Sequence, residues 1–411
     1  MQRHRILVRP DWQHKVESVG LTYHTIGGQT YWDESAYWEF TSAEIDRIEA
    51  ATGTLQEMCL KAGDFILDKN RLADLRIPEA AAARIRETWN AEPPALYGRM
   101  DLAYDGRDLK LLEYNADTPT SLVEAAVAQW YWLEDRFPKA DQFNSIHEHL
   151  VAKWKDLVEY VKQPVYFACE DNDEDWMTVT YLRDTAQQAE LLTAPIGMAA
   201  IGWDAGHRRF VDADERPMET IFKLYPWESL LADRFGTHAL ETMGHAQKDS
   251  VQWIEPIWKM LWSNKALLAI LWEMYPNHEL LLPAYLDGPR DLDAWVRKPL
   301  LGREGANVTV KVHGITVEDT AGRYGDGGFV WQQYVDLAAN GNPRLILGSW
   351  LVDGEPCGMG IREPDGYVTT NASRFVPHLF RQGVSTYRDG LRREPFLLSS
   401  RSEERQIPGV S

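Results

Sequence analysis

The stretch ALYGRMDLAYDGRDLKLLEYN, residues 95–115, decides the fold that we expect for this chain. Two runs of alternating apolar and polar residues flank Asp105-Gly106, a dipeptide that is typical of hairpin turns. The second run passes from Leu111-Leu112 directly into polar residues instead of continuing as an apolar strand. The stretch therefore predicts a β-hairpin whose second strand ends in polar side chains.

Four polar side chains of this hairpin are expected to lie close together, because side chains along a strand point the same way at every second residue. The first strand presents Arg99 with Asp101, and the second presents Glu113 with Asn115. Carboxylate and amide oxygens are ligands that Mg²⁺ prefers, and an arginine beside them would contact a phosphoryl group. A cross-strand salt bridge between Arg99 and a carboxylate on an exposed hairpin face explains the same spacing slightly better, so both interpretations stay open at this point.

The composition narrows the classes of function. The chain has 411 residues, with 62 acidic against 43 basic residues and a net charge of −19, a field that repels phosphate backbones and argues against a nucleic-acid partner. Three cysteines without metal-ligand spacing are expected to be free thiols in a reducing compartment. Without a signal-like N-terminus or an apolar run of the roughly 20 residues that a membrane span requires, we expect a cytoplasmic protein with no membrane partner.

The first half of the chain mixes helices with an α/β pattern. Thr41-Ser-Ala-Glu44 is a capping box, and Pro78 suits the first position of another helix that runs through Trp89. A further helix is expected over 121–133. The apolar strand VYFAC, residues 165–169, is followed by an acid cluster and a helix, which predicts an α/β lobe.

The second half is expected to contain helices over 252–275 that break near Ser263-Asn264, and then antiparallel sheet with turns at Asp353-Gly354 and Asp365-Gly366. The predicted fold class is therefore α+β. Because no linker marks a clean boundary, we divide the chain into three regions that interleave: 1–115, 116–235 and 236–411.

A glycine-bearing loop lies in KPLLGREGANV, residues 298–308. Gly302 and Gly305 frame Arg303-Glu304, so the backbone N–H groups and the cation would suit a flap over phosphates. An ordinary tight turn explains these residues at least as well. Lys265, which lies among apolar residues, either reaches water or meets an anion.

The acid cluster EDNDED, residues 170–175, would bind an amine. Acids in the first turn of a helix also stabilise its dipole by about 0.3–1 kcal/mol each, and the pattern alone favours that simpler interpretation. The sequence shows no nucleophile elbow, Cys/His pair or GxGxxG motif before a helix, so hydrolase and dinucleotide-binding functions lack support.

Seven motifs in order resemble the synthetase domain of the glutathionylspermidine synthase family: GRMD at 98–101, EYNADTPTS at 113–121, EDNDEDW at 170–176, KLYPWE at 223–228, SNKALL at 263–268, KPLLGREGANV at 298–308 and SRFVPH at 373–378. The chain is more similar still to stand-alone bacterial relatives of that domain, which are described as acid–amine ligases. The resemblance implies an ATP-grasp-like fold with an N-terminal pre-ATP-grasp α/β lobe. It also implies a reaction in which ATP and Mg²⁺ serve to join a carboxylate to an amine through an acyl phosphate.

The resemblance also implies roles for single residues. Three would bind Mg²⁺: Asp101, Glu113 and Asn115. Arg99 would contact the phosphate or acyl phosphate, Arg303, Glu304 and Gly305 would belong to a closing loop, and Arg362 would lie at the transferring phosphoryl group. Lys265 and Lys298 would hold the ATP phosphates, and Gln333, Tyr334 and Val335 would form the hinge that faces adenine. In commoner ATP-grasp enzymes the lysines precede the Glu/Asn pair, whereas here the pair comes first, which implies a permuted ATP-grasp.

The substrate side departs from the family, because Thr118-Pro119-Thr120-Ser121 replaces small and thiol-bearing residues. We therefore expect an acid other than glutathione, a carboxylate or peptide, near Thr118, Thr120 and Ser121. Glu174 and Asp175 would receive the amine, a cationic and polyamine-like one. A non-catalytic ATP-binding sensor and an interaction protein are the alternatives, and a nucleotide-binding measurement separates the latter from a ligase.

Overall fold

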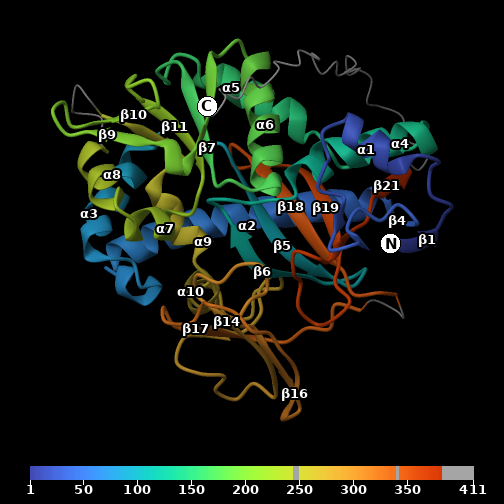
Figure 1. Cartoon of the computed structure of the whole chain (residues 1–411). Coiled ribbons are helices and arrows are strands. Elements are labelled where there is room, and N and C mark those ends of the chain that lie inside the picture. The colour runs from blue at the N-terminus through green and yellow to red at the C-terminus, as the bar shows by residue number, and fades with distance from the viewer. Residues whose placement is uncertain (244–249, 339–341, 382–411) are drawn as a thin grey trace.

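The predicted hairpin is present in the computed structural model, which describes residues 1–243, 250–338 and 342–381 as a mixed α/β fold (Figure 1). Strand β5 (Tyr97–Tyr104) pairs antiparallel with β6 (Leu109–Asn115). At the turn, the Asp105 carboxylate accepts hydrogen bonds from the backbone N–H groups of Arg107 and Asp108. Gly106 has a φ of 95°, which glycine adopts readily. The local sequence signal for this hairpin is therefore confirmed.

The hairpin forms one edge of a five-stranded antiparallel sheet in the order β20-β19-β18-β5-β6. The other strands are β18 (Ile346–Val352), β19 (Glu355–Glu363) and β20 (Arg374–Phe375). The predicted turn at Asp353-Gly354 joins β18 to β19. Asp365-Gly366 does not make a tight turn, because Glu318 accepts the backbone N–H groups of the two residues that follow and draws them into a longer loop.

A second, four-stranded sheet is parallel throughout, as the α/β pattern predicts. Its order is β12 (Gln252–Ile254), β11 (Thr220–Leu224), β7 (Val165–Cys169) and β8 (Thr193–Gly197), and helix α6 (Asp173–Gln188) connects β7 to β8. The expectation of helices from residue 252 is wrong at its start, because Trp253 and Ile254 are buried as a strand beside β11. Helical structure follows in η4 (Ile257–Lys259), α9 (Met260–Ser263) and α10 (Ala266–Met274), with the predicted break at Ser263-Asn264.

A third sheet, five-stranded and antiparallel, lies below β5 and β6 in Figure 1. Its order is β13 (Ala284–Tyr285), β17 (Phe329–Gln333), β14 (Ala294–Pro299), β15 (Thr309–Val312) and β16 (Ile315–Asp319). The 298–308 loop connects β14 to β15. In Figure 1 it lies at the end of this sheet that faces the rest of the molecule.

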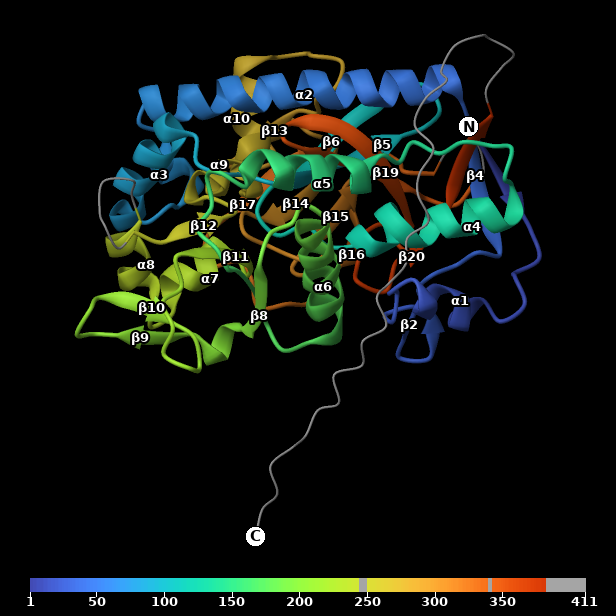
Figure 2. The same ribbon diagram turned by 90° about the horizontal axis from the view of Figure 1, so that it is seen from above.

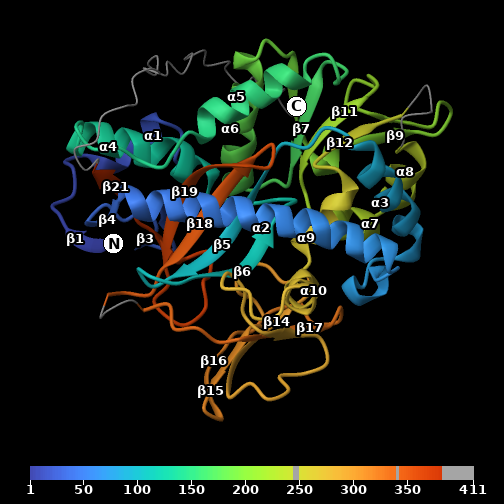
Figure 3. The ribbon, with the colours of Figure 1, turned by 180° about the vertical axis from the view of Figure 1, so that it is seen from behind.

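Helix α2 (Ser42–Asp68) runs along the molecule and contacts β6, β18 and β19, so that it covers one face of the first sheet (Figures 2 and 3). The predicted capping box at its start is confirmed, since the Thr41 and Glu44 side chains each accept the other's backbone N–H. Helix α3 (Glu79–Ala91) begins one residue after Pro78 instead of at it.

Shorter elements complete the fold. A three-stranded sheet has the order β1 (Gln2–Arg5), β4 (Ala36–Thr41) and β21 (His378–Arg381), and two small pairs are β2 (Thr25–Ile26) with β3 (Gln29–Thr30) and β9 (Gly202–Asp204) with β10 (Arg209–Val211). The remaining helices are α1 (Trp12–Ser18), η1 (Leu72–Leu75), α4 (Gln129–Arg136), α5 (Ile146–Leu157), η3 (Met198–Ala200), α7 (Trp227–Ala232) and α8 (Gly236–Thr242). The helix predicted over 121–133 contains a π-helical turn, η2 (Glu124–Ala128), before α4. None of the described helices is long and apolar enough to cross a membrane.

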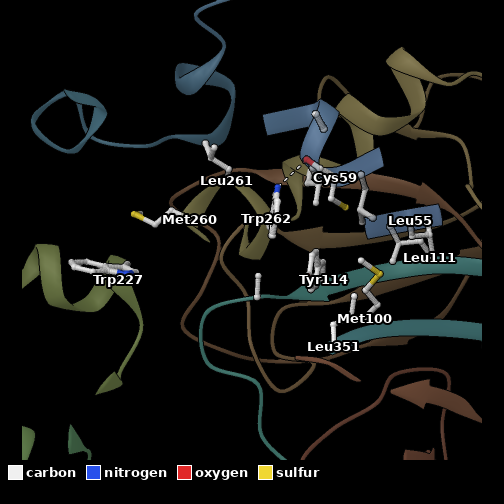
Figure 4. Packing of buried hydrophobic residues seen from close by; sticks show 14 of the residues in the cluster. Leu55, Cys59, Met100, Leu111, Tyr114, Trp227, Met260, Leu261, Trp262 and Leu351 are labelled. Carbon is white, nitrogen blue, oxygen red and sulfur yellow. Dashed lines mark hydrogen bonds between the residues drawn. The ribbon is translucent and has the colours of Figure 1, made fainter. Parts of the chain in front are cut away.

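The buried core between α2 and β6 positions the start of α10 (Figure 4). The Trp262 indole N–H donates to the Cys59 carbonyl oxygen at 3.0 Å, and its ring stacks on the Tyr114 ring with 5.4 Å between the ring centroids. Asn264 then donates to the Leu75 carbonyl oxygen at 2.7 Å and ends α9. These contacts place Lys265, the next residue, beside the polar end of the hairpin.

Candidate functional site

A cavity of about 1030 Å³ lies between the hairpin, the third sheet and the start of α6. The residues proposed from the sequence line it, with the exception of Ser121: Arg99, Asp101, Glu113, Asn115, Thr118, Thr120, Glu174, Asp175, Lys265, Lys298, Arg303, Glu304, Gly305, Gln333, Tyr334, Val335 and Arg362. Ser121 is buried behind the cavity wall. Segments that lie far apart in the sequence therefore meet around one space large enough for a nucleotide and a second ligand.

The four polar side chains of the hairpin meet as expected. The strand register pairs Asp101 with Glu113 and Arg99 with Asn115. Arg99 Nε donates to Asp101 Oδ1 at 2.7 Å, so the ion pair of the simpler interpretation exists. It runs within β5 instead of across strands and lies in the cavity wall instead of on an exposed face. Asn115 Nδ2 lies 3.0 Å from Glu113 Oε1 and 3.4 Å from Asp101 Oδ2, which joins the two carboxylates.

Two lysines from distant segments face these carboxylates. Lys265 Nζ lies 3.0 Å from Glu113 Oε2 and donates to the Gly302 carbonyl oxygen at 2.7 Å. Lys298 Nζ donates to the Leu112 carbonyl oxygen at 2.9 Å and to Gln332 Oε1 at 2.8 Å. Both ammonium groups are therefore held at the end of β6, which answers the open question about Lys265: it meets an anion.

The electrostatics of this cluster follow from burial and from the two lysines. Burial lowers the pKa of Lys298 to about 8, although Glu113 acts in the opposite direction. Burial alone would raise the pKa of Glu113, but Lys265 and Lys298 outweigh it and hold that pKa well below the usual range. Burial raises the pKa of Asp101 against the effect of Arg99, and Glu113 raises it further. The cluster thus combines an ionised Glu113 with cations that would attract phosphate groups.

The 298–308 loop reaches across the cavity through Arg303. Its guanidinium donates to Thr118 Oγ1 at 2.6 Å and to Glu228 Oε1 at 3.0 Å. Gly305 has a φ of 70°, and a Cβ there would collide with the Thr369 carbonyl oxygen, so the position requires glycine. Glu304 beside it also lines the cavity. The loop is more than a turn between strands, because its cation contacts two other walls of the cavity.

Arg362, on β19, closes another side of the cavity. Its Nε donates to the Ser373 carbonyl oxygen at 2.9 Å, and its two terminal nitrogens contact the Thr370 carbonyl oxygen at 2.7 Å and Ser121 Oγ at 3.1 Å. With the Asn371 carbonyl oxygen at 3.2 Å, four carbonyl and hydroxyl acceptors hold the guanidinium. Ser121 is therefore a support of Arg362 in this structure and lies outside the cavity lining.

Part of the cavity lining is apolar. Gln333, Tyr334 and Val335 follow directly from the end of β17. The neighbouring lining residues are Leu112, Val296, Leu337 and Ile346. Within the surrounding clusters, Val335 packs with Leu112, Leu337 and Ile346, and Tyr334 packs with Val296. A flat aromatic ligand would be able to bury its faces here.

The acid cluster begins helix α6 and also contributes to the cavity lining. Asn172 caps α6 by accepting the Asp175 backbone N–H at 2.9 Å, with three acids in the first turn, so the helix-dipole interpretation holds. Glu174 and Asp175 also line the cavity. Burial raises the pKa of Glu174, and it raises the pKa of Asp175 to about 6, where Glu174 adds to the shift. A cationic ligand would supply the counter-charge for both carboxylates.

The family follows from the sequence as a whole. The sequence pattern of the family described as "Glutathionylspermidine synthase preATP-grasp" matches residues 3–381. The chain belongs to this family. The resemblance on which the expected roles rest is thereby confirmed, while the roles themselves stay proposals.

Relatives within and around the family are named as ligases or synthetases. A Haemophilus influenzae protein named "Putative acid–amine ligase" is 43% identical over 392 residues, which cover 90% of this chain and 97% of that protein. The "Bifunctional glutathionylspermidine synthetase/amidase" of Escherichia coli is 27% identical, with 89% of this chain and 63% of that protein covered. The "Trypanothione synthetase" of Crithidia fasciculata is 28% identical, with 76% and 51% covered. The chain thus spans nearly the whole of the first relative and only part of the other two.

A solved structure shows the same overall fold. A glutathione synthetase-like effector from Globodera pallida in its apo form superimposes with a TM-score of 0.52 at 8% sequence identity, covering 90% of this chain and 96% of the other. The family's mixed α/β chain is therefore glutathione-synthetase-like in fold.

The structure adds cavity residues that the sequence argument missed. Tyr23 lines the cavity from the segment before β2, and Gln332 holds Lys298. Glu228 on α7 pairs with Arg303. The family motif KLYPWE already contained Glu228 and would have identified it. No local pattern marks Tyr23 or Gln332, because only the tertiary fold brings them to the cavity.

The hairpin end fits a hard cation in its donor types. Among residues 1–243, 250–338 and 342–381, no group of three or more His, Cys, Asp or Glu is arranged to hold a metal ion. Asp101 and Glu113 supply two carboxylates, and Asn115 touches both of them. An amide can turn over and present its oxygen, so the three side chains suit Mg²⁺, which commonly takes one or two carboxylates and completes its shell with water and phosphate.

Proposed function

We propose that this chain is an ATP-dependent ligase that joins a carboxylate to an amine through an acyl phosphate. One observation carries the proposal: cations and carboxylates from the hairpin, the start of α10, β14 and β19 converge on one cavity whose lining also contains an apolar part. A nucleotide has the same division between charged phosphates and an apolar base. The named functions of the relatives support a ligase over a sensor.

In this proposal ATP lies between the first and third sheets, as in a permuted ATP-grasp. The base would pack against Gln333, Tyr334 and Val335, where the lining is apolar. The phosphates would extend toward Lys265 and Lys298, whose charges Glu113 now offsets. The arrangement is supported by the glutathione-synthetase-like fold and by the distance in sequence between the hairpin and both lysines.

Asp101, Glu113 and Asn115 would hold Mg²⁺, which when bound offsets the negative charge of the ATP phosphates. Asn115 would do this by turning its amide oxygen toward the cavity. The protein's own contribution is to keep Glu113 ionised, which the two lysines achieve, and to hold Asp101 in place through Arg99.

The reaction would proceed in two steps. A substrate carboxylate oxygen attacks the γ-phosphorus, and the bond to the ADP oxygen breaks. The amine nitrogen then attacks the acyl carbon, the bond to the phosphate oxygen breaks, and the nitrogen loses its proton as the amide forms. Arg99 and Arg362 would stabilise the charge on the transferring phosphoryl group, and catalysis would come mainly from positioning and electrostatics.

The proposed substrate contacts lie at the rim formed by residues 118–121 and α6. Thr118 and Thr120 would face the acid, and Glu174 and Asp175 would attract a cationic amine, because burial raises the pKa of both carboxyl groups and a cation would stabilise their ionised forms. Arg303, which already contacts Thr118, would close the loop over bound substrates and keep water from the acyl phosphate.

An ADP-release screen tests the proposal. Purified protein is mixed with ATP, Mg²⁺ and crossed pools of carboxylates and amines, and each active mixture is examined by mass spectrometry for the conjugate. We expect ADP release that needs both an acid and an amine. Glu174→Gln with Asp175→Asn and an Asp108→Asn control, on the exposed hairpin turn, separate a charge effect in the cavity from one on the surface. Absence of ADP release and of Mg²⁺-dependent ATP binding would contradict the ligase proposal.

A further inference from the structure

A hydrogen-bonded chain runs from the cavity wall to a buried carboxyl group that has no part in the proposed function. Arg362 donates to Ser121 Oγ at 3.1 Å, and Ser121 Oγ lies 3.1 Å from the Tyr31 hydroxyl. The Tyr31 hydroxyl donates to Glu124 Oε1 at 2.8 Å. The Arg362 guanidinium also lies over the Tyr31 ring at 5.2 Å from its centroid. Four side chains from separate segments therefore form one connected unit.

With Glu124 Oε1 as the acceptor, chemistry fixes the direction of the other hydrogen bonds in this chain. An arginine only donates, and a tyrosine has a single hydroxyl proton, which goes to Glu124. Ser121 must therefore donate its proton to Tyr31, and this leaves a Ser121 lone pair free to accept from Arg362. If Glu124 offered no acceptor, the Tyr31 proton would turn toward Ser121. The serine proton would then point at an N–H group of Arg362.

The burial of Glu124 indicates that its carboxyl group contributes to function. Its exposed fraction is 0%, and its Oε2 has no hydrogen-bond partner among the described residues. Burial raises the pKa of Glu124 to about 7, and the charged or titratable groups that act on it are Tyr31, Glu174 and Arg362. A carboxyl group so placed costs stability. It lies at the start of η2, and single π-helical turns frequently occur at functional sites.

We propose that Glu124 is a positioning residue for Arg362, which acts through the hydroxyl groups of Tyr31 and Ser121 and fixes the direction in which the guanidinium faces the cavity. The inference rests on the proposed function, because it takes Arg362 as a contact of the terminal phosphoryl group. It adds a buried support that lies outside the cavity lining.

The test compares two nucleotides on variants of the full chain by calorimetry with Mg²⁺ present: ADP, and the non-hydrolysable β,γ-imido analogue of ATP. Tyr31→Phe and Ser121→Ala each interrupt the chain, and we expect each to weaken binding of the analogue by roughly tenfold while ADP binding stays unchanged. Glu124→Leu should behave in the same way. Glu124→Gln keeps an acceptor for Tyr31 and should stay within about twofold of the parent.

Tyr97→Phe is the matched control, because its hydroxyl is also buried and has no hydrogen-bond partner in the described part of the chain. If Tyr31→Phe keeps the parent's preference for the analogue, or weakens ADP and the analogue equally, Glu124 does not position Arg362. If the parent itself binds both nucleotides equally, the role of Arg362 and this inference fail, whereas the proposed function fails only without ADP release and Mg²⁺-dependent ATP binding. An Arg362→Met variant that loses the preference while the Tyr31 and Ser121 variants keep it would overturn this inference alone.

Discussion

Glu113→Gln perturbs the polar end of the cavity with the smallest change in shape. In the parent chain Glu113 Oε2 lies 3.0 Å from Lys265 Nζ, and Oε1 accepts from Asn115 at 3.0 Å. Glutamine keeps the size of the side chain and removes its charge. Lys265 and Lys298 then face each other with less counter-charge, so we expect the variant to lose stability as well as nucleotide binding.

The loss of stability can be sized from the exposed fractions. A charge-assisted hydrogen bond contributes about 1.5–3 kcal/mol. The Lys265 and Glu113 side chains are 11% and 25% exposed, so we take the lower end, about 1.5 kcal/mol. With an unfolding entropy of about 2.1 cal/mol/K per residue, this lowers the Tm of the chain by roughly 2 °C.

The pH dependence of that loss has a definite sign. The lysines hold the pKa of Glu113 below its ordinary 4.5 against the effect of burial, so the ionised group stabilises the fold above that pH. The difference in stability between parent and variant therefore has its full value at neutral pH. It shrinks as the pH falls below 4.5 toward the pKa that Glu113 has in the folded chain.

Thermal unfolding with and without Mg·ATP measures both effects. At about 100 times its Kd, the nucleotide stabilises the parent by about 2.7 kcal/mol, or roughly 3 °C. A tenfold weaker complex halves that shift at the same concentration. The control is Asp108→Asn, a like change on the exposed turn of the same hairpin. The reasoning is refuted if the parent shows no Mg·ATP shift, or if Glu113→Gln and Asp108→Asn shift equally.

Three further predictions follow from the cavity and its surroundings. Glu228→Gln removes the charge of one partner of Arg303 and weakens that contact, so trypsin should cut after Arg303 faster than in the parent, and the β,γ-imido analogue should slow that cut; equal cleavage with and without nucleotide would contradict a closing loop. Glu174→Gln with Asp175→Asn should weaken amine binding by roughly ten- to a hundredfold and leave ATP binding unchanged, and glutathione with spermidine should give little ADP above background; an unchanged amine response, or efficient glutathionylspermidine formation, would contradict the proposed substrate side. Because burial raises the pKa of Glu124 from 4.5 to about 7, the parent loses stability as the pH rises through this range. In urea unfolding, the free energy of unfolding of Glu124→Gln minus that of the parent should be larger at pH ~8 than at pH ~5 by on the order of 3 kcal/mol. Equal differences at both pH values would contradict the shift.

Local signals were sufficient for several elements. Alternation and the Asp105-Gly106 turn predicted the β5–β6 hairpin, and with it the meeting of Arg99, Asp101, Glu113 and Asn115, because both strands lie within about twenty residues and one turn sets their register. The capping box at Thr41 likewise depends on a few neighbouring residues. Where the deciding contacts are short in sequence, pattern and propensity are enough.

The resemblance to the family related residues that local sequence patterns do not connect. It predicted that Lys265, Lys298 and Arg362 share one site with the hairpin, and all three line the same cavity, although no periodicity connects these segments. Only the fold shows what each cation contacts: Lys265 reaches Glu113 because the Trp262 core fixes the end of α9 against β6.

Other features were decided by tertiary structure alone. Residues 252–254 are a strand because pairing with β11 buries Trp253 and Ile254, two residue types that suit a buried strand. Ser121, expected to face substrate, lies behind the wall in contact with Arg362. Tyr31 and Glu124 are ninety-three positions apart. Such contacts depend on how whole sheets pack against one another, and the free energy of that packing is a sum over distant pairs that no single stretch of sequence contains.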